Sequence, residues 1–249
     1  MTKAKSNMYS DSVKQWNVFI GCEYDCLYCR KSFQAQMKRQ KHNCEDCYEY
    51  KPHFHPERLK QSLPNTTGDE FIWACSSGDI TFAKEEWIEQ ILDRIRELDH
   101  KTFFFQSKNP KCFMKYKFPK NVLLGTTIES NRIYKTISKA PIVNNRLWDF
   151  QRVQHPRKVV TIEPIMDFDY WTLRRWIYSL HPERVYIGYD TKKSALEEPP
   201  FSKTVQLIAS LGAFTKVKLK YLPLEVLDRL PKLVKYEKID NKIEDYSGW

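Results

Sequence analysis

Three cysteines near the start of the chain, Cys22, Cys26 and Cys29, have the spacing of ligands to one metal centre. Three and then two residues separate them, so one compact loop can bring three thiolates together. Iron–sulfur clusters are usually held by four such thiolates, and a cubane held by only three leaves one iron open. Because an open iron can bind a small molecule and pass it an electron, this spacing predicts a reaction site.

A zinc knuckle or a set of unrelated structural thiols is the alternative explanation for these three cysteines. Zinc is usually held by four Cys or His ligands that come in short-spaced pairs. A single three-cysteine loop that opens a long chain does not have that pattern. We therefore expect the loop to hold an iron–sulfur cluster.

A second group of metal-ligating residue types lies in a polar insert at about residues 38–56. Cys44 and Cys47 form a Cys-x2-Cys pair, and thiolate plus imidazole is a common zinc ligand set. Free thiols, or a second cluster with ligands from elsewhere, are the alternatives. A complete tetrahedral zinc site would need two of the three nearby histidines, which are His42, His53 and His55.

The elements that must position these residues show a regular alternation. In residues 84–98, apolar side chains recur at helical spacing, which indicates a helix packing one face on a sheet. Shorter amphipathic stretches cover residues 111–116, 170–180 and 200–211. The runs with the composition of strands are residues 18–20, 71–75, 102–106, 122–127, 158–162 and 184–187.

This alternation predicts the α/β class, with a parallel sheet and helices outside it. About six units suit a partial (β/α)6 barrel, which we expect over residues 1–190 with the Cys/His insert inside it. The chain changes character near Glu197-Glu198-Pro199-Pro200, and residues 216–220 alternate like a strand. Residues 191–249 are expected to form a C-terminal extension that packs on the barrel.

Small and polar residues stand where several of the strands end. A parallel barrel has its chemistry at the C-terminal edge of its strands, so these residues are candidates for a binding site. The alternatives are a plain turn capped by Asp79 or Thr81 for the first segment, and caps or surface ion pairs for the others. The candidates are Ser76, Ser77, Gly78 and Asp79, then Lys108, then Glu129, Ser130 and Asn131, and finally Glu163.

The formal net charge of the 249-residue chain is +10. Lys and Arg attract phosphates at long range, so a nucleic acid or nucleotide is one expected partner. The lysines are dispersed along the chain, and the alternative is that the charge serves solubility only.

The chain has no run of about 18 apolar residues, and residues 1–7 have no apolar signal core. Its seven cysteines, an odd number, argue against a secreted disulfide scaffold. An oxygen-sensitive cluster also needs reducing surroundings. We expect a cytoplasmic protein without a membrane partner.

The cysteine run, with Tyr28 directly before the third cysteine and an apolar β-like run before Gly21, resembles the cluster loop of the radical S-adenosylmethionine enzymes. The resemblance implies a 4Fe–4S cluster on the three cysteines, whose unique iron binds S-adenosylmethionine. Reductive cleavage would give methionine and a 5'-deoxyadenosyl radical that abstracts a hydrogen atom. It also implies a six-stranded partial barrel and an electron donor such as flavodoxin or ferredoxin.

The same resemblance implies roles for the strand-end residues in binding S-adenosylmethionine. Residues 76–79 occupy the position of a Gly-Gly-Glu-like segment that holds the methionyl amine, although their letters differ. The other implied cofactor-binding residues are Tyr28, Lys108 for the methionyl carboxylate, Glu129 and Glu163 for ribose hydroxyls or substrate, and Ser130 or Asn131 for the ribose or carboxylate.

Residues 106–110 and 125–131 look more narrowly like a phage- and archaea-associated radical S-adenosylmethionine family of largely unassigned function, itself similar to spore photoproduct lyase. The likeness spans most of residues 16–190. The lyase resemblance implies repair of a thymine dimer in DNA, with a further cysteine returning a hydrogen atom. Cys75 and Cys112 are the candidates for such a donor, but neither has that donor's sequence context.

Together these observations predict hydrogen abstraction from a nucleobase, a nucleotide or a nucleic acid, in modification or repair. A small metabolite or a peptide is the alternative substrate. Two further alternatives involve no radical. They are a zinc-bearing nucleic-acid-binding protein without catalysis, and a barrel that keeps its cluster only as a scaffold.

Overall fold

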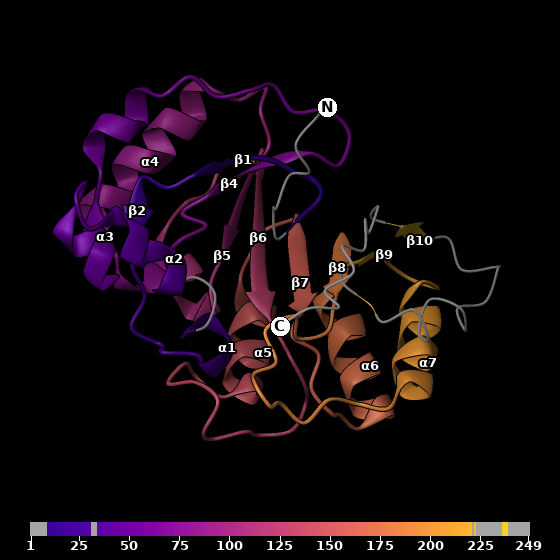
Figure 1. The fold of residues 1–249 in the computed structure, drawn as a ribbon. Helices are drawn as coiled ribbons and strands as arrows, with labels where there is room; N and C mark the ends of the chain where they lie inside the picture. The colour runs from indigo at the N-terminus through magenta and orange to yellow at the C-terminus, as the bar shows by residue number, and fades with distance from the viewer. Residues whose placement is uncertain (1–8, 31–33, 221, 223–235, 239–249) are drawn as a thin grey trace, which may run out of the picture.

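The computed structural model of the chain describes residues 9–30, 34–220, 222 and 236–238. In this part of the chain a parallel sheet of eight strands, in the order β1-β4-β5-β6-β7-β8-β9-β10, curls into a half-barrel (Figure 1). The strands are β1 Ser12–Trp16, β4 Phe71–Ala74, β5 Phe103–Gln106, β6 Val122–Thr127, β7 Lys158–Ile162, β8 Arg184–Ile187, β9 Lys216–Leu219 and β10 Tyr236–Lys238.

Helices connect these strands, as the alternating pattern predicts. In α4 the apolar stripe points into the core, with Ile88, Ile91 and Ile95 fully buried. Figure 1 shows α5, α6 and α7 side by side along the sheet. The four long helices are α4 Glu85–Glu97, α5 Val143–Arg152, α6 Tyr170–Leu180 and α7 Phe201–Leu211, and the short ones are α1 Leu27–Cys29, α2 Ala35–Met37 and α3 Glu45–Glu49.

Successive residues of each strand face opposite sides of the sheet, which gives the molecule two apolar clusters. On β5, Phe103 and Phe105 belong to the large cluster that includes the buried helix residues, while Phe104 belongs to a smaller cluster on the other face. Tyr9 fills this smaller cluster, and its hydroxyl lies 2.8 Å from both the Gln106 Oε1 and the Thr161 Oγ1. The smaller cluster consists of Tyr9, Phe71, Trp73, Phe104, Leu123, Val159 and Tyr186.

The prediction of a first barrel strand at residues 18–20 is wrong. That position is taken by β1, an edge strand whose three middle residues are only half-buried, so its sequence mixes polar and apolar types. Residues Phe19–Ile20 form β2, which pairs antiparallel with β3, His53–Phe54, in a separate two-stranded sheet. The run is apolar because Phe19 and Phe54 both pack on Trp87 of α4.

The α/β class is confirmed, but the sheet has eight strands rather than six, since β9 and β10 come from the segment expected as an extension. Residues 111–116 were expected as a helix and form a 3-10 turn, Pro110–Lys115. The extension also contributes α7, and its residues 221, 223–235 and 239–249 lie outside the described part of the chain. Among the described helices, none has both the length and the apolar character that a membrane crossing requires.

Candidate functional site

The cysteine loop directly follows β2. Gly21 ends that strand with a φ of +110°, a conformation that favours glycine, and Cys22 comes next. Cys26 precedes the one-turn helix α1, which ends at Cys29, and the Cys29 amide donates to the Cys26 carbonyl at 2.9 Å. This turn brings the thiols of Cys26 and Cys29 into hydrogen-bond contact.

The three thiols lie close enough to change one another's protonation. The hydrogen bond with Cys29 lowers the pKa of Cys26 to about 5, and burial opposes the shift. The same hydrogen bond, and then burial, raise the pKa of Cys29. Burial raises the pKa of Cys22, with smaller contributions from Asp79 and Cys26. Metals bind the thiolate form, which Cys26 reaches most easily of the three thiols.

A loop after β6 lies against the cysteine loop and fixes its position. The Ser138 hydroxyl lies 3.1 Å from the Cys26 Sγ. Backbone hydrogen bonds join the two loops, from the Leu27 amide to the Ile137 carbonyl at 2.8 Å and from the Lys139 amide to the Tyr24 carbonyl at 2.7 Å. Ser138 could not be predicted as a neighbour of the cysteines, because a serine in a loop without periodicity gives no indication of its contacts.

The segment after β4, residues 76–79, lies directly beside the start of the cysteine loop. The Gly21 amide donates to the Ser77 carbonyl and the Asp79 amide donates to the Gly21 carbonyl, each at 3.1 Å. Gly78 is required here, because a Cβ at this position would lie 2.9 Å from the Gly21 carbonyl oxygen. The Ser76 hydroxyl donates to the Asn17 side chain at 2.9 Å, so Asn17 is a further residue of this contact.

The Asp79 carboxylate points to the neighbouring strand end rather than into the open. It accepts hydrogen bonds from the Ser107 hydroxyl at 2.7 Å, the Lys108 amide at 2.8 Å and the Thr81 amide at 3.0 Å. Burial raises the pKa of this carboxyl. Asp79 therefore caps the following turn, as in the alternative considered for it, and also joins the ends of β4 and β5.

Glu129, after the end of β6, is the centre of a charged cluster. Two of its partners, Tyr28 and Lys108, were predicted as site residues, and the third, Arg146, was not. The Glu129 carboxylate accepts from the Tyr28 hydroxyl at 2.5 Å, the Lys108 Nζ at 2.6 Å and the Arg146 Nη1 at 2.7 Å. Burial alone would raise the pKa of Glu129, but Arg146 and Lys108 outweigh it and hold that pKa at about 2. The Lys108 ammonium also lies 4.3 Å from the centre of the Tyr28 ring.

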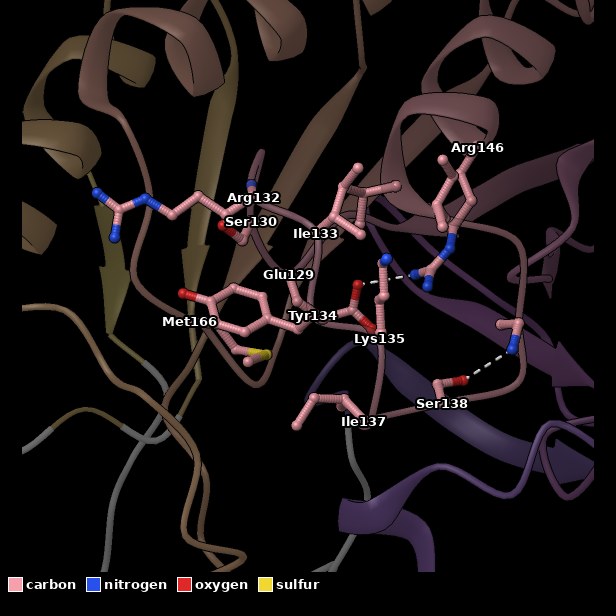
Figure 2. Close-up of a pocket in the computed structure, with 13 residues that line it drawn as sticks. Glu129, Ser130, Arg132, Ile133, Tyr134, Lys135, Ile137, Ser138, Arg146 and Met166 are labelled. Atoms are coloured by element: carbon pink, nitrogen blue, oxygen red, sulfur yellow. Dashed lines mark hydrogen bonds and ion pairs between the residues drawn. The ribbon is translucent and has the colours of Figure 1, made fainter.

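A cavity of about 150 Å³ opens beside this charged cluster (Figure 2). Its wall is formed by the loop at residues 130–140, by the start of α5 and by Glu129 and Arg146, which point toward each other in Figure 2. Ser138, the neighbour of Cys26, lies on the same wall. The cavity is therefore lined both by members of the charged cluster and by the residue that contacts Cys26.

The remaining strand-end candidates have partners elsewhere. The Ser130 hydroxyl donates to the Asp167 carbonyl at 2.5 Å, and the Asn131 side chain donates to Asp169 at 3.0 Å, so both hold the loop after β7. Glu163 forms an ion pair with the buried Lys220. Burial lowers the pKa of Lys220 well below its usual value.

The two candidate hydrogen donors, Cys75 and Cys112, lie in the large cluster on the helix side of the sheet. Both thiols are buried, with 3% and 5% of their surface exposed. Burial raises the pKa of each to about 12, so both are protonated at neutral pH. Neither belongs to the apolar cluster on the opposite face.

The insert brings Cys44, Cys47, His53 and His55 into one group that could hold a metal ion, with all four ligand atoms within 4.8 Å of one another. The Cys47 Sγ lies 3.3 Å from the Nε2 atoms of both His53 and His55, and the Cys44 Sγ lies 3.6 Å from the His53 Nε2. His42, the third histidine considered, is exposed and is not part of the group.

The surroundings of the group match those of a metal site. Each imidazole points its Nε2 into the group and has a partner for its Nδ1, the Lys51 carbonyl at 2.7 Å for His53 and the Glu57 carboxylate at 3.0 Å for His55. Partners of this kind fix the tautomer and orientation of histidines that bind metals. The Cys47 amide donates to the Cys44 Sγ at 3.5 Å. The two pairs reach one point because α3 begins after Cys44 and β3 contains His53.

These features define an α/β protein with a half-barrel sheet and a Cys2His2 group that could hold a metal ion. The chain belongs to the family described as protein of unknown function DUF5131, whose model matches residues 8–175. The match contains the cysteine loop, the Cys2His2 group and the charged cluster around Glu129, and it ends within α6. No curated protein matches the chain.

Proposed function

We propose that this protein is a radical S-adenosylmethionine enzyme, in which Cys22, Cys26 and Cys29 hold a 4Fe–4S cluster. The observation that carries the proposal is the position of the three thiols, in one loop that is hydrogen-bonded to the end of β4. A parallel half-barrel gathers its strand ends at this edge, where catalytic residues of barrel enzymes stand. When bound, the cluster supplies the electron for reductive cleavage of S-adenosylmethionine.

Within this proposal the described residues bind and orient the cofactor. Residues 76–79 would hold the methionyl amine, and Lys108 would bind the methionyl carboxylate. Glu129 is a positioning residue, because its carboxylate holds Lys108 and Tyr28 in place and is itself held by Arg146. The cavity beside Glu129 offers space for part of the ligand.

Three further strand-end residues act in binding the ribose or the substrate. Glu163 directly follows β7 and has Lys220 as its partner, and the Lys220 ammonium lies 4.5 Å from the centre of the Tyr9 ring. Ser130 and Asn131 orient the loop after β7 through their bonds to Asp167 and Asp169.

For the Cys44, Cys47, His53 and His55 group we propose Zn²⁺ as the ion. The four ligand atoms lie within 4.8 Å of one another, and two thiolates with two imidazoles are a common structural zinc set. With four protein ligands, the ion would have no open position for a substrate. The group belongs to the insert and is separate from the three-cysteine loop, so the two centres would have different roles.

The proposed substrate is a nucleobase, a nucleotide or a nucleic acid. The net charge of +10 supports this class, since it attracts polyanions. A base within a duplex would have to be flipped out to reach the strand ends. A flavodoxin or ferredoxin would supply the electron. A small metabolite or peptide is the alternative substrate, and binding to oligonucleotides separates the two.

Anaerobic reconstitution with iron and sulfide tests the cluster. We expect the wild-type protein to become brown, with four iron atoms per chain as the cluster type requires, and the Cys26→Ser variant to lose most of that iron. Cys112→Ser is the matched control, since its thiol lies in the core outside the loop, and it should load like the wild type. A colourless wild type with zinc on the loop cysteines would support a zinc-bearing nucleic-acid-binding protein instead.

A further inference from the structure

We infer that the metal ion of the Cys44, Cys47, His53 and His55 group fixes the geometry of the cysteine loop, through contacts that run from His53 to Gly21. The inference rests on the proposed Zn²⁺ in this group and does not depend on the iron–sulfur cluster. It assigns the insert the role of a positioning element for the three-cysteine loop.

The helix and the strand pair that carry the four ligands are short. Helix α3 has five residues and one buried side chain, Cys47, and β2 and β3 pair over two residues each. A helix this short and a sheet of two such short strands gain little stability from their own backbone hydrogen bonds, and among the described residues only Phe19 and Phe54 join the sheet to Trp87 by ring contacts. Metal bonds to two residues around α3 and two around β3 would tie these elements together, because binding free energy at such a site becomes folding free energy.

His53 connects the group to the cysteine loop through one carbonyl. Its Nε2 faces the two cysteines, and its Nδ1 lies 2.7 Å from the Lys51 carbonyl oxygen. The same oxygen packs on Gly21, where an added Cβ would lie only 2.3 Å away. No side chain separates the two backbones, so a shift of the Lys51 carbonyl would move Gly21 and, next to it, Cys22.

Two further contacts, both between backbones, join the metal-binding group to the residues before the cysteine loop. Ile20 pairs with His53 in the β2–β3 sheet, and the His55 amide donates to the Val18 carbonyl at 2.7 Å. Two metal ligands therefore pair with the residues that lead directly into the cysteine loop.

Hydrogen exchange followed by mass spectrometry tests the inference on protein that carries no iron. The readouts are zinc per chain and the exchange rate of the peptide over residues 18–29. We expect one zinc ion per wild-type chain. In His55→Ala, the zinc should be lost and this peptide should exchange about tenfold faster, as local opening becomes more frequent.

Two variants serve as controls. His55→Cys keeps four ligands and should keep both the zinc and the slow exchange. His42→Ala removes an exposed histidine of the same insert and should behave like the wild type. Exchange of β5, β6 and β7 should stay unchanged in every variant, which checks that the half-barrel remains folded. If His55→Ala does not fold, the wild type stripped of zinc by a chelator and then reloaded gives the same comparison.

Two results would overturn the inference. In the first, the wild type binds zinc, but the loss of that zinc does not change the exchange rate over residues 18–29. In the second, the wild type binds no zinc. Neither result bears on iron loading by the cysteine loop. Conversely, a loop that binds no iron but is loosened by zinc loss would contradict the proposed function and leave this inference standing.

Discussion

Glu129 has an environment unlike that of an ordinary surface carboxylate. It is 5% exposed, and Tyr28, Lys108 and Arg146 all donate to it. Its pKa of about 2 lies below the usual 4.5, so its ionised form favours folding. This contribution is complete above about pH 4.5 and is lost as the pH falls toward 2, with a size of roughly 3 kcal/mol.

We therefore predict that Glu129→Gln lowers the free energy of unfolding at pH 7 by roughly 3 kcal/mol, because Arg146 and Lys108 lose their buried counter-charge. The gap between variant and wild type should narrow as the pH falls below about 4.5. Urea unfolding at a series of pH values measures it, with Glu86→Gln, on the exposed surface of α4, as the control. A gap that stays constant with pH would contradict this account of Glu129.

The residues of this cluster show how far sequence alone could reach. Lys108 and Glu129 were predicted as site residues because they follow strands, and the structure brings them together at 2.6 Å. Arg146 could not be predicted, since it comes from α5 and its burial depends on the partner that it finds there. Likewise the sequence predicts that two of three histidines complete a zinc site in the insert. Which two they are, His53 and His55, depends on how the backbone folds around Cys44 and Cys47.

At the scale of elements, the connection between β2 and the insert depends on the absence of a side chain at Gly21. We predict that Gly21→Ala lowers the free energy of unfolding by at least about 2 kcal/mol more than Gly68→Ala. Both glycines have positive φ, but a Cβ at Gly21 would collide with the Lys51 carbonyl, whereas nothing lies within 4 Å of one at Gly68. Gly68, at a φ of +55°, also lies in the left-handed region open to other residues, whereas Gly21, at +110°, does not, so both strain and collision act at Gly21.

Chemical unfolding of the two glycine variants gives the comparison directly. Iron loading after reconstitution is the second readout, and it should fall in Gly21→Ala and not in Gly68→Ala. Equal losses of stability in the two variants would mean that the contact between Gly21 and the insert is unimportant.

The elements themselves were predictable where their periodicity was strong. The stripe of α4 and the apolar runs of β4 to β8 lie where the pattern placed them. The first strand was misplaced because the apolar run at residues 18–20 is buried by Trp87 rather than by the barrel, while the true edge strand β1 carries polar residues. Helix α5 was missed because its buried residues include Arg146, which does not read as apolar.

At the scale of the whole molecule, the charge of +10 predicts binding to single-stranded DNA. We expect the affinity for a short oligonucleotide to fall steeply between about 50 and about 200 mM salt, because counterions are released when phosphates are neutralised. Fluorescence anisotropy with a labelled oligonucleotide measures this. An uncharged peptide nucleic acid of the same sequence is the control. Equal affinity for both, or no binding at low salt, would favour a small-molecule substrate.

The most direct test of the central claim is the formation of 5'-deoxyadenosine. After anaerobic reconstitution, the protein is reduced with dithionite in the presence of S-adenosylmethionine, and the product is followed by mass spectrometry. We predict that the wild type forms 5'-deoxyadenosine and that Cys26→Ala forms none. A reconstituted wild type that forms none, or a Cys26→Ala variant that forms as much as the wild type, would contradict the assignment of the three cysteines to a radical S-adenosylmethionine centre.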